Sequence, residues 1–148
     1  MNYKLLILLI GSYLLAFSIN LMPAIKHPDL NVDIFNTIVT IIFMFLLLMY
    51  AKKRSRILKL FSIFGVISGV IVFVITTFEH AMFGNVILDA IASIQYPLYL
   101  IFITPLFGGN ILFDLSYGSY SLLMSLFYGI VFVLTVNFNK KDQPVNSG

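Results

Sequence analysis

Four stretches of this chain run for 18 or 19 residues without an Asp, Glu, Lys or Arg: residues 5–22, 34–51, 60–78 and 120–138. A helix rises about 1.5 Å per residue, so about 20 residues cross the roughly 30 Å hydrocarbon core of a bilayer. Backbone amides find no water in lipid, and a helix satisfies them within one segment. We therefore expect four membrane-spanning helices in an all-α, polytopic integral membrane helical bundle that forms a single transmembrane domain over residues 1–138.

The composition excludes an ordinary soluble domain. Hydrophobic residues make up 60% of the chain and charged residues 10%, against about 45–50% and about 25% in soluble proteins. A soluble domain of 148 residues could not bury so much apolar surface. There is no Cys, which excludes disulfide scaffolds, thiolate zinc sites and cysteine nucleophiles. The segments between the apolar stretches, and the polar C-terminal tail at residues 139–148, are too short for a soluble domain.

A fifth apolar segment, residues 86–107, is long enough to span a membrane but is interrupted. It contains Asp89, Gln95, Pro97 and Pro105. Proline removes a helical hydrogen bond, and an intramembrane break is tolerated only where protein or water covers the freed backbone groups. The sequence therefore predicts five apolar segments, of which the fourth in order is broken.

The charges leave the path of this fourth segment open. Five of the nine basic residues lie within residues 52–59, which contain no acid, so the positive-inside rule predicts a cytoplasmic loop there and a cytoplasmic N-terminus in a cell membrane. Five alternating spans, which we expect first, would leave Lys140 and Lys141 outside. A re-entrant fourth segment would remove that conflict. An interfacial helix over residues 83–95, followed by a membrane segment over 96–113, is a further alternative.

Small residues recur at four-residue spacing and are candidates for close helix packing, since lipid provides no hydrophobic force between helices. The candidates are Ser12 and Ala16, followed by Asn20, in the first segment, Gly65 and Gly69 in the third, and Ser121, Ser125 and Gly129 in the last. Gly65 and Gly69 fit either a homodimer face or packing within the chain, which we expect first. The second segment has Asn36, Thr37 and Thr40 in its first two turns. It has no glycine and many large residues, so we expect it to face lipid more than the others.

Tyrosines lie near the ends of several predicted segments. Amphipathic rings favour the headgroup region. We therefore interpret five of them as interfacial anchors: Tyr3, Tyr50, Tyr96, Tyr117 and Tyr120.

Asp89 and Gln95 are the candidate polar residues inside the membrane. Ionisable groups in such segments are costly unless they line water or find a partner, so they indicate function. Together the two side chains would suit a path for an ion or proton. The structural alternative is an Asp favoured at a helix start by the helix dipole and a Gln that bonds across helices, and we expect this alternative first.

Glu79 and His80 form a candidate outer-face cluster with His27, Asp29 and Asp33. Imidazole and carboxylate groups suit zinc and similar ions. No pair has a metal-binding spacing such as H-E-x-x-H. We therefore expect solvated end-of-helix residues and no metal site.

The sequence contains no pattern typical of cofactor, phosphate or nucleic-acid binding, nor a catalytic constellation. We expect no cofactor and no nucleic-acid partner. The predicted function is that of a small multi-pass, non-enzymatic accessory, regulatory or self-assembling subunit. Its expected partners are the lipid bilayer, further copies or a larger membrane complex. The alternative is a small ion or solute transporter or channel that uses Asp89 and Gln95 as a homo-oligomer.

Overall fold

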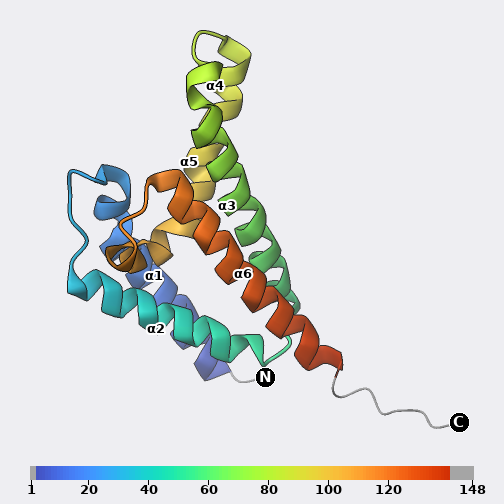
Figure 1. Ribbon diagram of the computed structural model, residues 1–148. Helices are drawn as coiled ribbons and strands as arrows, with labels where there is room; N and C mark the ends of the chain where they lie inside the picture. The colour runs from blue at the N-terminus through green and yellow to red at the C-terminus, as the bar shows by residue number, and fades with distance from the viewer. Residues whose placement is uncertain (1–2, 141–148) are drawn as a thin grey trace, which may run out of the picture.

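The computed structural model describes residues 3–140 and is all-helical in that range (Figure 1). The elements are α1 (Tyr3–Lys26), α2 (Ile34–Ala51), α3 (Arg56–Met82), α4 (Val86–Ser93), α5 (Gln95–Leu98), the π-helical turn η1 (Tyr99–Ile103), the 3-10 helix η2 (Thr104–Leu112) and α6 (Tyr117–Lys140). Five stretches of the described residues are long and apolar enough to cross a membrane, with α4 to η2 counted together. The predicted all-α bundle with five apolar segments is confirmed. Residues 141–148 of the predicted tail lie outside the described residues.

The first helix is longer than the sequence predicts. The apolar stretch was expected to end before Pro23, but α1 continues to Lys26. Proline has no N–H, so the carbonyl of Ile19 loses its helical donor. The Asn36 side chain replaces it, with Nδ2 donating to Ile19 O at 3.1 Å. A side chain from α2 thus allows α1 to pass through its proline.

Helices α3 and α6 form a close antiparallel pair. A Cβ on Gly65 would collide with the ring of Tyr128, and one on Gly69 would lie 2.7 Å from Ser125 Cβ and closer still to Ser121 O. The two glycines therefore allow α3 and α6 of the same chain to pack closely. Because α6 covers this face of α3, the face is not open to a second copy of the chain. Gly65 meets Tyr128, whereas Gly69, which comes later in α3, meets Ser125, which comes earlier in α6. The two helices are therefore antiparallel.

The antiparallel pairing determines the path of the fourth segment. Gly118 at the start of α6 packs against Thr76 near the end of α3, whereas Lys59 near the start of α3 lies over the Phe132 ring. The chain that joins α3 to α6 therefore leaves and returns at the same end of the bundle. The N-terminal end of α1, the loop between α2 and α3, and the end of α6 lie at the opposite end (Figure 1). This is the path of the re-entrant alternative, and it differs from the five alternating spans expected first.

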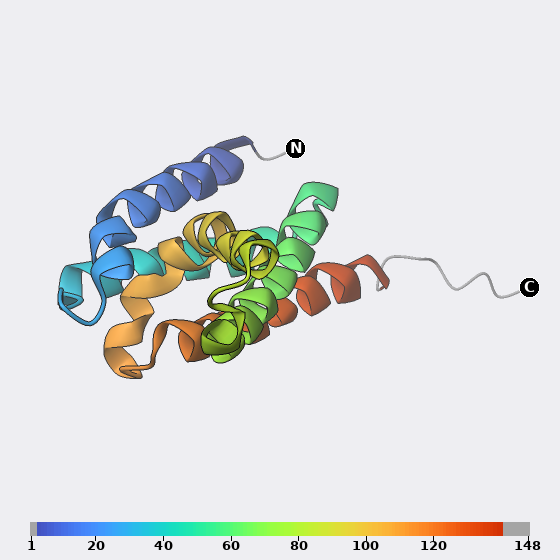
Figure 2. The ribbon, with the colours of Figure 1, turned by 90° about the horizontal axis from the view of Figure 1, so that it is seen from above.

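The fourth segment fills the space between two helix pairs. It contacts α1 and α2 through η2, and α3 through α5 and η1, and seen from above it lies between the α1–α2 pair and the α3–α6 pair (Figure 2). Its chain reaches the middle of two neighbouring helices, where Tyr13 of α1 and Tyr128 of α6 donate to the carbonyls of Ile101 and Phe102. The Phe102 ring extends further, with its centroid 5.1 Å from that of Phe61 near the start of α3.

This packing corrects two expectations from the sequence. Helix α2 was expected to face lipid, yet it has the largest buried share of the candidate spans, because η2 packs against its polar first turns. Tyr50 and Tyr120 were expected at the headgroups, yet both are buried. The hydroxyl of Tyr120 donates to Leu106 O inside the bundle, so its role is to hold the fourth segment.

We predict that Gly69→Ala destabilises the protein by about 1–3 kcal/mol, the usual cost of overpacking a filled interior. Gly129→Ala is the matched control on the facing helix, since a Cβ there would meet nothing within 4 Å, and it should be neutral or slightly stabilising. Unfolding in bicelles by a denaturing detergent measures both. Equal stability of the two variants would contradict the packing described above.

Candidate functional site

The re-entrant segment carries a series of backbone carbonyls that accept hydrogen bonds from side chains of the neighbouring helices. Pro105 removes the N–H that would bond to Ile101 O in an α-helix, and Tyr13 Oη donates to that oxygen at 2.9 Å. The neighbouring carbonyl of Phe102 accepts from Tyr128 Oη at 2.7 Å. Side chains near the middle of α1 and α6 therefore satisfy two carbonyls of the descending limb.

The returning limb is held in the same way. Gly108 O accepts from Thr37 Oγ1 at 2.8 Å, and Pro105 O accepts from Asn20 Nδ2 at 3.1 Å and Thr40 Oγ1 at 3.3 Å. A Cβ at Gly108 would collide with Asn36 O of α2. Only glycine therefore lets η2 approach α2 closely enough for these bonds.

Asn20 is the centre of this polar network. Its Nδ2 also donates to Thr40 Oγ1 at 2.8 Å, and its Oδ1 accepts from Asn36 Nδ2 at 3.0 Å. Asn20 and Thr40 are fully buried and Asn36 nearly so. We call these residues with Thr37 the amide–hydroxyl network: Asn20, Asn36, Thr37 and Thr40.

The chemistry of the amide–hydroxyl network is that of a structural clamp. Its members are amides and hydroxyls, which neither exchange protons nor carry charge at neutral pH. Their donors are used to bind backbone carbonyls and one another, which leaves little capacity for a substrate. Buried networks of this kind specify one arrangement when they are fully satisfied.

The structure does not bring Asp89 and Gln95 together. Asp89 lies in the first turn of α4 and is exposed, with its backbone carbonyl accepting from Ser93 Oγ at 2.9 Å. Gln95 begins α5 and is buried, and its Oε1 has no hydrogen-bond partner among the described residues. The two side chains therefore do not form one polar site within a single chain.

Glu79 and His80 lie near the end of α3 and face different surroundings. Glu79 is half-buried and lines a polar hollow of about 380 Å³ between α3 and the start of α6, together with Thr76, Thr77 and Tyr117. The exposed ring of His80 lies 6.5 Å from that of Phe83. No group of three His, Cys, Asp or Glu within residues 3–140 could hold a metal ion.

Sequence reasoning missed the residues that hold the re-entrant segment. Asn36, Thr37 and Thr40 were visible as polar residues in the first turns of an apolar span, and Asn20 as part of a small-residue stripe. Their spacing of one helical turn placed them on one face of α2. The signal that could have found their role was the coincidence of this polar face with a proline-broken segment that needs donors.

No family model matches this chain, and neither a curated protein nor a solved structure is similar to it.

We predict that Asn20→Leu lowers the free energy of unfolding by about 1–3 kcal/mol, because it leaves buried partners without hydrogen bonds. Asn137→Leu is the matched control, since Asn137 is exposed on α6. Detergent-induced unfolding in bicelles compares the two. If Asn20→Leu proved as stable as the control, the network would not be what holds the segment.

Proposed function

We propose that this chain is a non-enzymatic, membrane-embedded subunit that works by associating with a second copy or with another membrane protein. The surface that would carry the association is the hairpin formed by the end of α3 and by α4. We call residues 78–94 the α3–α4 hairpin. The bundle core supports this proposal indirectly. Its polar side chains are engaged in hydrogen bonds within the chain, so the exposed surfaces are the better candidates for function.

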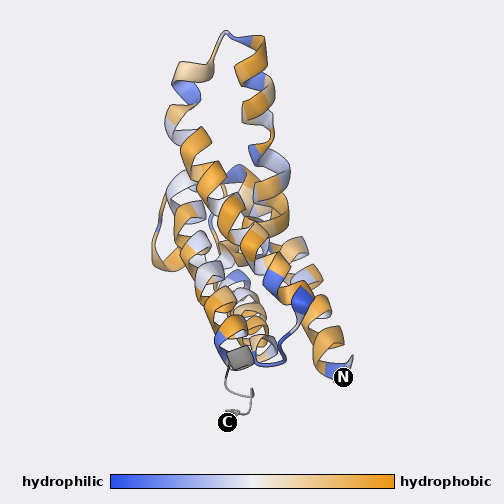
Figure 3. Ribbon diagram, turned by 90° about the vertical axis from the view of Figure 1, so that its right-hand side faces the viewer, coloured by the Kyte–Doolittle hydropathy of each residue, from blue (hydrophilic) through white to orange (hydrophobic). Residues whose placement is uncertain are grey.

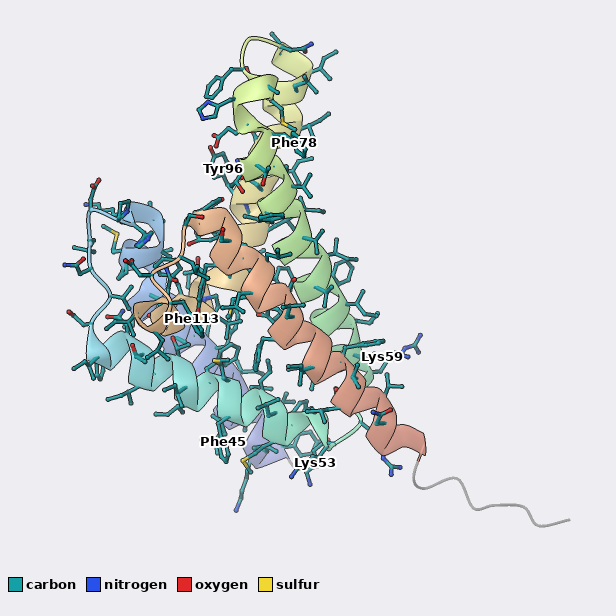
Figure 4. The ribbon with its side chains drawn as sticks, in the orientation of Figure 1. Phe45, Lys53, Lys59, Phe78, Tyr96 and Phe113 are labelled. Atoms are coloured by element: carbon teal, nitrogen blue, oxygen red, sulfur yellow. The ribbon has the colours of Figure 1, made fainter. Side chains whose placement is uncertain are left out.

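The α3–α4 hairpin projects beyond the other helices at its end of the bundle (Figure 3). No residue of α4 is buried. Val86 is 84% exposed and Ile87 71%. Phe78 and Tyr96, at the base of the hairpin, are also exposed (Figure 4).

The length of α3 sets the position of this apolar surface in a membrane. Its 27 residues span about 40 Å, whereas the hydrocarbon core measures about 30 Å. With the basic residues at the start of α3 placed at one interface, the tip of the hairpin reaches the headgroups or the water beyond. An exposed apolar surface there is typical of a protein–protein contact.

The turn of the hairpin is built to hold its shape. Gly84 adopts φ +90°, a conformation that other residues rarely take. Asn85 then caps α4, its Oδ1 accepting from Ile87 N at 3.0 Å. The apolar side chains are therefore presented on a defined helical hairpin.

The transport alternative has less support. It needs Asp89 and Gln95 on one path, and they lie apart within the chain. A channel formed between copies would have to bring Asp89 of one copy to Gln95 of another, yet Gln95 is already buried. We therefore place association first.

The proposal includes a membrane orientation. We place the chain as a multi-pass protein in a cell membrane, with the loop at residues 52–59 and the N-terminus in the cytoplasm. The support for this is the positive-inside rule. Under the re-entrant path, the C-terminal end of α6 falls on the same basic side.

A photo-crosslinking residue in place of Ile87 tests the association. We expect a defined adduct, of twice the chain mass for self-assembly or of another fixed mass for a partner protein. The matched control is the same residue at Leu126, 64% exposed on α6, which should give no adduct. A second change, Phe83→Glu, should abolish the adduct. A chain that stays monomeric, with no more adduct at Ile87 than at Leu126, would refute the proposal.

A further inference from the structure

An apolar cavity of about 340 Å³ lies between α1, α2 and the start of α3, at the end of the bundle opposite the α3–α4 hairpin. The lining residues include Leu6 and Ile10 of α1, Phe43 and Leu47 of α2, and Ile57 of α3. The volume lies within the range of about 300–1,000 Å³ that is typical of small-molecule sites. Cavities with such hydrocarbon walls stay dry and take apolar guests.

The exposure of the lining residues indicates where the cavity opens. Ile10 and Ile57 are well exposed, whereas Phe43 and Leu47 are each only 1% exposed. The cavity therefore runs from the outer surface, between α1 and α3, inward to α2. In a membrane this mouth faces the bilayer, where the abundant apolar guest is an acyl chain.

The mouth lies in the most basic part of the protein. Ser55 lines the cavity and caps α3, its Oγ accepting from Leu58 N at 3.3 Å. Lys53 lies in the loop between α2 and α3, which carries Ser55 (Figure 4). Lys4, Lys52, Lys53 and Arg56 are among the cationic residues of the segments that form this end.

The helices that line the cavity carry no acidic residue along the lengths that form its walls. Residues 3–26 and 34–78, which supply every wall of the cavity, contain no Asp or Glu. Lys59 points elsewhere, with its Nζ 5.9 Å from the centre of the Phe132 ring. Basic side chains next to the bilayer attract anionic headgroups.

We infer that this cavity binds one acyl chain of an anionic phospholipid, whose phosphate is held by the basic residues at the mouth. The apolar walls suit an acyl chain, and the basic residues at the mouth favour an anionic headgroup. The site shares no residue with the α3–α4 hairpin. A test that refutes the proposed association therefore leaves this inference unaffected, and the reverse also holds.

The chain contains no tryptophan, so a single introduced Trp reports only its own surroundings. Phe43→Trp places the reporter at the inner end of the cavity. Phe45→Trp is the matched control on the same helix, since Phe45 is 61% exposed and points away from the bundle (Figure 4). Each variant is reconstituted in phosphatidylcholine vesicles with a small fraction of brominated phosphatidylglycerol or brominated phosphatidylcholine, which quench Trp on contact.

We expect brominated phosphatidylglycerol to quench Phe43→Trp with an apparent affinity about fivefold higher than brominated phosphatidylcholine for each basic residue that contacts the headgroup. Phe45→Trp should respond equally to both lipids. Changing Lys52, Lys53 and Arg56 to Gln should abolish the preference. Leu9→Phe, which fills the cavity and keeps the charges, should abolish the quenching of Phe43→Trp and leave that of Phe45→Trp unchanged.

Two results would overturn the inference. Quenching of Phe45→Trp without any quenching of Phe43→Trp would mean that no acyl chain enters the cavity. Equal quenching of Phe43→Trp by both lipids would mean that the basic end does not select the headgroup.

Discussion

The fold depends on side chains that replace the hydrogen bonds its prolines remove. Pro23 frees Ile19 O, which accepts from Asn36 Nδ2, and Pro105 frees Ile101 O, which accepts from Tyr13 Oη. A free carbonyl in lipid costs several kcal/mol, so a chain with these breaks folds stably only when such donors surround them. This requirement explains why polar side chains lie in the centre of a bundle with a mean hydropathy of +1.02.

The same requirement separates the core of the molecule from its functional surfaces. The amide–hydroxyl network is neutral and occupied with holding the fourth segment. Two further features lie at the ends of the bundle: the apolar α3–α4 hairpin at one and the basic mouth of the apolar cavity at the other. Association and lipid binding are therefore proposed at these two surfaces, away from the amide–hydroxyl network.

The sequence was sufficient for the class of fold and for most helices, because long uncharged stretches allow no other structure in lipid. It indicated that the fourth segment is broken. The charge conflict kept the re-entrant path open as an alternative to the five alternating spans that were expected first, and pattern alone could not decide between the paths. The decision rests on contacts between residues far apart in the chain, such as Gly118 with Thr76 and Thr37 with Gly108. For the same reason Tyr120 was taken for an interfacial anchor: its position near a segment end was visible, but the carbonyl that it binds was not.

The re-entrant path is the central claim, and the absence of cysteine from the chain allows a direct measurement. Single cysteines are introduced at Phe83, Phe113 and Lys53, all of them exposed, and intact cells are treated with a membrane-impermeant maleimide. The account predicts that Phe83→Cys and Phe113→Cys, which flank the fourth segment, are labelled from the same side, and Lys53→Cys only after the membrane is opened. Labelling of Phe83→Cys and Phe113→Cys from opposite sides would mean that the segment crosses the membrane, and would contradict the account.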